Sequence, residues 1–172
     1  MKKKIAKISL ASVFSALSVV FILLGSILEV LDLTVAALCA LIIHISIFEI
    51  KDKYPLLIYF SSSVLSIILC PFTSAMLYYV FFFGYYPILK VKLKRLGKFN
   101  AKIICTVIFN AVFILLMLLF KTVFALQNEP FFMYIILLSV YNVFFICFDR
   151  CIDVLLYVYV KRIRPKLPIG RI

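Results

Sequence analysis

The sequence is poor in charged residues and in residues that interrupt secondary structure. Only 15% of its 172 residues are charged, and it has four glycines and six prolines. So few chain-breaking residues leave little room for long loops and exclude a low-complexity or disordered chain. Its hydrophobic fraction is 66%, whereas soluble domains have roughly 45–50% apolar residues. The polar groups are too few to cover a surface that faces water, so we expect lipid to be the natural solvent of the fold.

Sequence motifs of known catalytic chemistry are also missing. The chain has no phosphate-binding P-loop, no GxSxG nucleophile elbow and no HExxH zinc-binding pattern. Its five cysteines lie in apolar runs without CxxC or metal-ligand spacing, which predicts that they act as small apolar side chains. These cysteines are Cys39, Cys70, Cys105, Cys147 and Cys151. We therefore expect no enzymatic activity, no cofactor and no metal site.

Basic residues outnumber acidic ones by 19 to 7, which gives a formal net charge of +12. An excess of this size can indicate nucleic-acid binding, but here the basic residues form short clusters between apolar runs. Such clusters are typical of the cytoplasmic loops of membrane proteins. A basic rim also attracts anionic headgroups, by about 1 kcal/mol per Lys or Arg. We expect the lipid bilayer, and not nucleic acid, to be the partner of these charges.

The apolar runs predict six membrane helices, since a span needs about 17–25 residues. The last predicted helix is longer than one span and either tilts or extends past the cytoplasmic interface. The first run is too long for the hydrophobic region of a signal peptide and is not closed by an A-x-A site. Pro71 divides the longest run, because proline removes a helical donor and clashes with the preceding turn; a re-entrant pair there is the alternative. The predicted helices are residues 5–28, 33–50, 54–70, 72–89, 103–125 and 131–160. The expected fold is an all-α, polytopic bundle that forms one domain over residues 1–172.

The distribution of charge predicts the orientation of the bundle. Six spans place the N-terminus, residues 51–53, residues 90–102 and the C-terminus on one side of the membrane. These segments hold all but two of the 19 basic residues, the exceptions being Lys121 and Arg150. The connections on the other side of the membrane contain no basic residue, and their charged residues are Glu29, Asp32 and Glu129. The positive-inside rule therefore predicts a multi-pass protein of the cell membrane with both termini in the cytoplasm.

Three ionisable residues interrupt the last apolar run. Asp149 and Asp153 share one helix face, and Arg150 can pair with Asp153 one turn away. Charges at membrane depth are costly, and they are usually either paired or functional. The pattern predicts a self-paired structural cluster near the inner interface or a role in conformational or partner coupling. His44 and Glu49 lie in the same cytoplasmic half and could join this cluster.

Two asparagines are expected nearer to the middle of the membrane. Asn110 and Asn142 belong to the last two predicted helices, where hydrogen bonding between helices is the usual role of an amide side chain. A pocket for a small molecule could also use these groups.

Small residues recur at four-residue spacing on the first helix. Ala11 and Ser15 form one pair and Ser12 and Ala16 another, so the members of each pair share a face. Small side chains at this spacing let a second helix approach closely. The pattern predicts packing inside the bundle or a docking face for a partner protein in the membrane.

The segment SLASVFSALSVV at residues 9–20 resembles the small-residue first helix of the substrate-binding S components of energy-coupling factor (ECF) transporters. The sequence LDLT at residues 31–34, with the apolar run that follows, is similar to the start of the second helix in that family. The resemblance covers about residues 8–45 and extends further only in topology and length. It implies that the first helix docks on a transmembrane coupling subunit that works with ATPases. It also implies that Glu29 and Asp32 lie near a substrate entrance.

Two functions follow from these observations. The first is a subunit that captures a small solute for an ECF-type importer, with candidate contacts at Glu29, Asp32, Asn110 and Asn142. The alternative is a non-transporting scaffold that recruits partners through its basic cytoplasmic loops. Its six-helix shape is also shared by small bacterial scaffold proteins of the cell-wall elongation machinery. A small channel or secondary carrier is less favoured, because neither internal repeats nor polar broken helices are clear.

Overall fold

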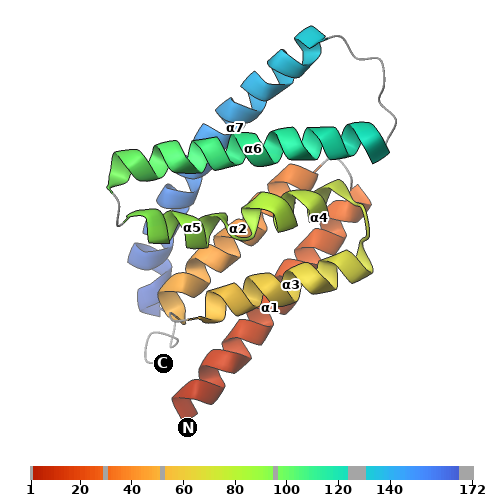
Figure 1. Cartoon of the computed structure of the whole chain (residues 1–172). Coiled ribbons are helices and arrows are strands. Elements are labelled where there is room, and N and C mark those ends of the chain that lie inside the picture. The colour runs from red at the N-terminus through yellow and green to blue at the C-terminus, as the bar shows by residue number, and fades with distance from the viewer. Residues whose placement is uncertain (1, 29–30, 51–52, 95–96, 124–130, 167–172) are drawn as a thin grey trace.

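The computed structural model describes residues 2–28, 31–50, 53–94, 97–123 and 131–166 (Figure 1). The first helices are α1 (Lys2–Leu28), α2 (Asp32–Glu49) and α3 (Tyr54–Leu69). They are followed by α4 (Ser74–Tyr78), a π segment (Tyr79–Phe83) and α5 (Tyr86–Leu93). The last elements are α6 (Lys98–Val123), α7 (Phe131–Val158), a second π segment (Tyr159–Ile163) and a 3-10 turn (Arg164–Lys166). The described residues contain no strand, which confirms the all-α expectation.

Two features of the fold differ from the sequence prediction. A single helix was expected over 72–89, but the structure divides this stretch into α4, the π segment and α5, and α5 continues to Leu93. The helix expected at 103–125 begins earlier, at Lys98. Both differences bring basic residues of the predicted 90–102 loop onto helices. The turn after α3 contains Pro71 and then Phe72, which has a φ of 62°.

Among the described residues, four helices have the length and apolar composition that crossing a membrane requires. They span Lys4–Leu28, Asp32–Glu49, Asn100–Leu118 and Phe132–Lys166. Helix α3 is apolar but shorter, and α4 and α5 are separated by the π segment and a turn. The four long helices are suited to a membrane-embedded chain.

Helix α2 lies at the centre of the bundle. It contacts α1, α3, α4, the π segment, α5 and α7. Small side chains allow this close packing, because Ala36, Cys39 and Ala40 on α2 are all fully buried. Helix α1 approaches the same region at Gly25, where an added Cβ would lie 3.1 Å from the Val35 side chain. A larger residue at position 25 would push α1 away from α2.

Aromatic rings fill the space between the π segment, α6 and α7. The ring centroids of Phe82 and Phe109 are 4.9 Å apart, and those of Phe109 and Phe145 are 4.4 Å apart. Phe83 meets Phe148 on α7 edge to face, at 4.9 Å. These distances are typical of favourable aromatic pairs. The aromatic cluster therefore holds the second half of the chain together.

The outer surface of the bundle is apolar, and several polar side chains face inward. Leu17 on α1, Phe60 on α3 and Val143 on α7 are exposed by 41%, 67% and 62%. In contrast, Ser62 on α3 is fully buried and shares a hydrogen bond of 2.6 Å with Tyr79. This pattern suits a fold whose outer surface is solvated by lipid.

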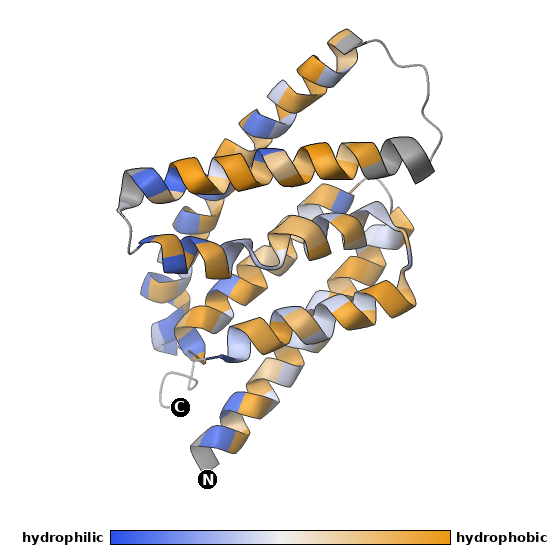
Figure 2. Ribbon diagram, in the orientation of Figure 1, coloured by the Kyte–Doolittle hydropathy of each residue, from blue (hydrophilic) through white to orange (hydrophobic). Residues whose placement is uncertain are grey.

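Hydrophilic residues gather at one end of the bundle (Figure 2). The N-terminal ends of α1 and α6 lie at this end, together with the C-terminal ends of α2, α5 and α7 (Figure 1). Lysines and arginines of the described residues occur at or next to the helix ends on this side, among them Lys4 on α1, Lys53 before α3, Lys92 on α5 and Arg162 after α7. We call it the basic end, and the end where α1 meets α2 the opposite end.

Candidate functional site

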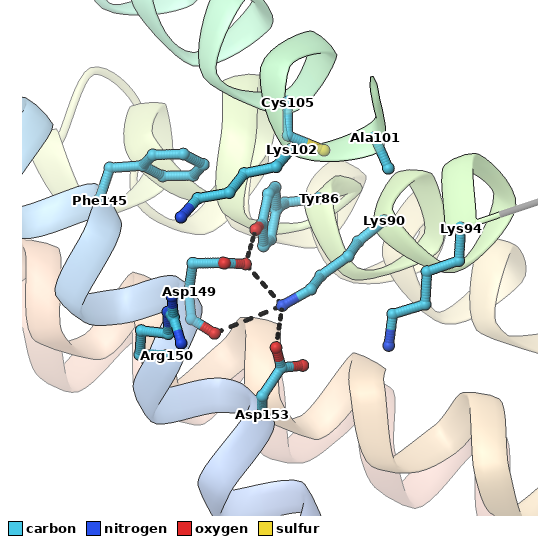
Figure 3. A pocket seen from close by; sticks show the side chains of 10 residues that line it. All are labelled: Tyr86, Lys90, Lys94, Ala101, Lys102, Cys105, Phe145, Asp149, Arg150 and Asp153. Atoms are coloured by element: carbon cyan, nitrogen blue, oxygen red, sulfur yellow. Dashed lines mark hydrogen bonds and ion pairs between the residues drawn. The ribbon is translucent and has the colours of Figure 1, made fainter. Parts of the chain in front are cut away.

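A pocket of about 440 Å³ opens at the basic end, between α5, α6 and α7 (Figure 3). We call it the basic pocket. It is lined by side chains of both charge signs and by apolar groups: Tyr86, Lys90, Lys94, Ala101, Lys102, Cys105, Phe145, Asp149, Arg150 and Asp153. Its volume lies within the roughly 300–1,000 Å³ of small-molecule pockets.

Lys90 is the centre of the polar network in this pocket. Its Nζ atom lies 2.5 Å from Oδ1 of Asp149 and 2.9 Å from Oδ2 of Asp153. It also donates a hydrogen bond of 3.3 Å to the backbone carbonyl of Asp149. A lysine ammonium has three donors and Lys90 has three acceptors, so its hydrogen-bonding capacity is filled. Tyr86 adds a further hydrogen bond to the Asp149 carboxylate from its hydroxyl group.

The Lys90 and Asp149 side chains are well shielded from solvent. They are 10% and 14% exposed, whereas the Asp153 side chain is 45% exposed. A charge that is removed from water needs a close partner of opposite sign, because the desolvation of an unpaired ion is costly. The network therefore neutralises Asp149 and joins α5 firmly to α7.

The backbone before α5 places Tyr86 and Lys90 against α7. Gly84 donates its backbone N–H to the carbonyl of Tyr79, five residues earlier, at 2.8 Å. This bond closes a π turn, which contains more residues than an α turn and so changes which face the next residues present. The Tyr59 hydroxyl group satisfies the Val80 carbonyl in the same segment, at 2.9 Å. Pro87 then starts α5 in the first helical turn, where proline is tolerated.

The predicted pairing of Arg150 with Asp153 is not the pairing that forms. Both carboxylates are paired with Lys90, and Arg150 is an exposed residue that lines the pocket. Arg150 and Asp153 do not pair within their own helix turn, because Lys90 on a neighbouring helix binds both carboxylates. Sequence reasoning missed Lys90 and Tyr86, since Lys90 was counted with a cytoplasmic loop. The only signal was the four-residue spacing of Tyr86 and Lys90, which matches that of Asp149 and Asp153.

Glu49 belongs to a separate ionic contact. Its side chain is 2% exposed, and its Oε1 atom lies 3.1 Å from Nε of Arg164 and 3.3 Å from the Tyr159 hydroxyl group. This contact ties the end of α2 to the segment that follows α7. His44 is fully buried on α2. Neither of its ring nitrogens has a hydrogen-bond partner within the described part of the chain.

Asn110 and Asn142 form a reciprocal amide pair between α6 and α7. Nδ2 of Asn110 lies 3.0 Å from Oδ1 of Asn142, and Nδ2 of Asn142 lies 2.8 Å from Oδ1 of Asn110. Each amide also donates a hydrogen bond to the backbone of its own helix. The structure thus brings these two residues together as an interhelical link, while a contact with substrate stays a prediction.

The two small-residue pairs of α1 face different surroundings. Ser15 is buried and lies 2.8 Å from the hydroxyl group of Ser61 on α3, and Ala11 packs against the core. Ser12 and Ala16 are exposed. The Ala11 and Ser15 face is therefore used for packing inside the bundle, and its role as a docking surface stays a prediction. The Ser12 and Ala16 face stays open.

The predicted substrate entrance lies at the opposite end of the bundle. Glu29 is outside the described residues, and Asp32 is the first residue of α2. The pocket bordered by Leu33, Tyr78 and Tyr141 near that end has a volume of about 10 Å³. A hydrogen bond of 2.9 Å joins the hydroxyl groups of Tyr78 and Tyr141 beside it. This space is about the size that a single water molecule needs, which is roughly 10–15 Å³.

No protein-family model, curated protein or solved structure matches this chain. The chemistry of the basic pocket follows from its own side chains. Lys90 and Tyr86 both donate hydrogen bonds to the Asp149 carboxylate, so this carboxylate is poorly placed to accept a proton from a substrate. The three other cations of the pocket are Lys94, Lys102 and Arg150, and none forms an ion pair with another described residue. The pocket is consequently better suited to binding than to proton transfer.

Proposed function

We propose that the chain is an integral membrane subunit that acts by associating with a partner in the membrane, without capturing a solute in its own bundle. In this proposal it spans the cell membrane six times, with α4, the π segment and α5 forming the fourth span. Both termini and the basic end lie in the cytoplasm, as the positive-inside rule requires. The apolar outer surface and the gathering of charges at one end support this placement.

The observation that carries the proposal is the packing of the end opposite to the basic end. Tyr78, Phe113 and Tyr141 border a space of only about 10 Å³ there, and the Phe113 and Tyr141 rings are 4.2 Å apart. A subunit that captures a solute from outside needs a cavity of several hundred cubic ångströms, on the order of 300 Å³ or more. Among the described residues, the space that these rings border is far too small for such a solute.

The contact surface in this proposal is the Ser12 and Ala16 face of α1. Both residues are exposed, and they lie among large exposed apolar side chains such as Val13 and Val20. A small-residue stripe within an apolar surface allows another membrane helix to approach closely. We therefore propose that the partner presents a transmembrane helix to α1.

Solute capture for an ECF-type importer is the second candidate function. The same exposed Ser12 and Ala16 face favours it, because it is the part of the resemblance that stays available for docking on a coupling subunit. Under this function Asp32, Asn110 and Asn142 contact the solute, and the space near Tyr78 and Tyr141 must open when the solute enters.

Native mass spectrometry of the gently solubilised protein tests the two functions. The double variant Ser12→Leu/Ala16→Leu removes the small-residue face, and Val143→Leu/Val154→Leu enlarges two exposed side chains of α7 as the matched control. We expect a protein partner that the control variant retains and the test variant loses, with no small solute bound. A retained small solute that is lost in Asn142→Leu would support the second function. A partner retained equally by both double variants would contradict the docking face.

A further inference from the structure

We propose that the basic pocket binds the phosphate group of an anionic phospholipid, with the headgroup held between α5, α6 and α7. The pocket lies at the end of the bundle that the proposed topology places in the cytoplasm. That topology decides only from which leaflet the lipid comes. Binding itself is a property of the pocket and can be measured without knowing the orientation.

The charges of the pocket favour an anionic ligand. Four cations and two carboxylates line it. Both carboxylates are occupied by Lys90, whose three donors are filled by Asp149 and Asp153. Four positive charges against two negative ones leave the pocket with a net charge of +2, and Lys94, Lys102 and Arg150 form no ion pair with other described residues. Cations on three neighbouring helices of a membrane protein form a suitable site for a lipid phosphate.

The cations surround the pocket from different sides. Lys94 lies at the end of α5, Lys102 lies on the first turns of α6, and Arg150 lies on α7. In Figure 3 the Lys102 side chain extends from α6 across the pocket toward α7. An arginine guanidinium can bind two phosphate oxygens at once, and lysine adds a point charge. The phosphate oxygens can thus be shared among three helices.

The walls of the pocket favour a lipid over a small soluble phosphate. Ala101, Cys105 and Phe145 line it, and all three are buried. Exposed apolar side chains continue from the pocket along the outer surfaces of α6 and α7, at Ile103 and Ile146, each 48% exposed. A glycerol backbone and its acyl chains can lie against this apolar surface while the phosphate meets the cations. A soluble phosphate would gain only the charge interactions.

Lipid retention in native mass spectrometry provides the test. The purified chain is delipidated and then mixed with phosphatidylglycerol or, separately, with phosphatidylcholine. The variant Lys102→Gln/Arg150→Gln removes two pocket cations. The matched control Lys92→Gln/Arg162→Gln also removes one lysine and one arginine, from exposed positions of α5 and of the segment after α7 that do not line the basic pocket. Size-exclusion profiles establish that both variants are folded.

The expected result is retention of phosphatidylglycerol that falls about 25-fold in Lys102→Gln/Arg150→Gln and less than about twofold in the control, because each of the two cations near the headgroup contributes on the order of a fivefold change in affinity. Phosphatidylcholine should be retained weakly by all variants. A separate arm uses glycerol 3-phosphate, which has the phosphate but no acyl chains. If it binds as tightly as phosphatidylglycerol and is lost in the pocket variant, the phosphate site is supported and the lipid source is overturned.

Equal loss of phosphatidylglycerol in the pocket variant and the control would overturn the proposal, because it would indicate a general attraction to the basic end. Retention that is unchanged in both would overturn it as well. These outcomes are independent of the partner experiment, which depends on Ser12 and Ala16. Failure of the lipid site and failure of the proposed function are therefore distinguishable.

Discussion

Lys90 on α5 and Asp149 on α7 form an ion pair of 2.5 Å across 59 residues of sequence. This contact joins α5 to α7 near the basic end. Phe148, which directly precedes Asp149 on α7, packs against Phe83 of the π segment before α5. Toward its beginning, by contrast, α7 is largely exposed, with Phe132 at 70%. The ion pair is therefore a principal anchor of α7.

The first prediction concerns the removal of the Lys90 charge. Lys90→Met leaves the Asp149 carboxylate shielded from solvent and without its cation. We expect a loss of about 3 kcal/mol in the free energy of unfolding, which is typical when one partner of a buried ion pair is removed. Unfolding by SDS in mixed micelles, followed by circular dichroism, measures this change.

The matched control for Lys90→Met is the double variant Lys90→Met/Asp149→Asn. It removes both charges, so we expect it to be more stable than Lys90→Met alone, even though it carries one more substitution. Equal or greater instability of the double variant would show that Lys90 acts through its packing and not through its charge.

The second prediction concerns the amide pair between α6 and α7. Asn110→Leu and Asn142→Leu each remove one side of the pair and leave the other amide without its interhelical partner. We expect each to lower the free energy of unfolding by about 0.5–1.5 kcal/mol, the usual range for interhelical hydrogen bonds in membranes. The double variant should cost less than the sum of the two single variants. Strict additivity would mean that the two amides stabilise the bundle independently.

The third prediction concerns the close contact of Gly84 with Tyr59. A Cβ at position 84 would lie 2.5 Å from Cδ2 of Tyr59 and 2.9 Å from the backbone oxygen of Tyr79. Gly84→Ala should therefore destabilise the fold by about 1–3 kcal/mol, as overpacking does in a dense core. It should also lower the retention of phosphatidylglycerol, since α5 would move.

Gly97 supplies the comparison for Gly84. Its φ of 101° is unfavourable for alanine, but an added Cβ would meet nothing within 4 Å. Gly97→Ala should thus cost only about 1–2 kcal/mol of backbone strain and should leave lipid retention unchanged. Thermal unfolding and lipid retention of the two variants are measured side by side. Lipid retention that stays at the native level in Gly84→Ala would refute the positioning role of this contact.

The fourth prediction concerns the orientation of the bundle. Cysteines are placed at exposed positions of the opposite end, by Leu31→Cys or Phe72→Cys, and of the basic end, by Lys53→Cys or Lys92→Cys. The background carries Cys147→Ser and Cys151→Ser, because both of these cysteines are exposed. A membrane-impermeant maleimide should label the first two variants in intact cells and the other two only after permeabilisation. The reverse pattern would mean that the termini lie outside.

The positions of the helices were largely predictable from the sequence. Apolar runs of this length can be satisfied only as helices in lipid, because an apolar solvent offers no partner for backbone N–H and C=O groups. The break after α3 followed from Pro71. Gly84 and Pro87 indicate that the helix can bend or unwind between α4 and α5. The π turn itself could not be predicted, since it depends on the packing of Tyr59 over Gly84, a contact between two helices.

The candidate site was predictable only in part. Asp149 and Asp153 could be identified as candidates from the sequence, because burying a carboxylate within an apolar run costs free energy. Their partner was assigned to Arg150 by spacing along one helix, whereas Lys90 takes that place from a neighbouring helix. The interhelical link of Asn110 and Asn142 was easier to foresee, because each amide has few alternatives within an apolar run.

The sequence by itself determined that this chain forms apolar helices and that its basic residues gather at one end. Both properties depend on the composition of the chain and on the order of its residues. Their physical reason is the free-energy cost of exposing unpaired backbone groups or charged side chains to lipid. Only the tertiary structure decided which charges meet, which face of α1 stays open and where a pocket forms. These features arise from side chains that are distant in sequence, and the backbone turn at Gly84 decides which of them face each other.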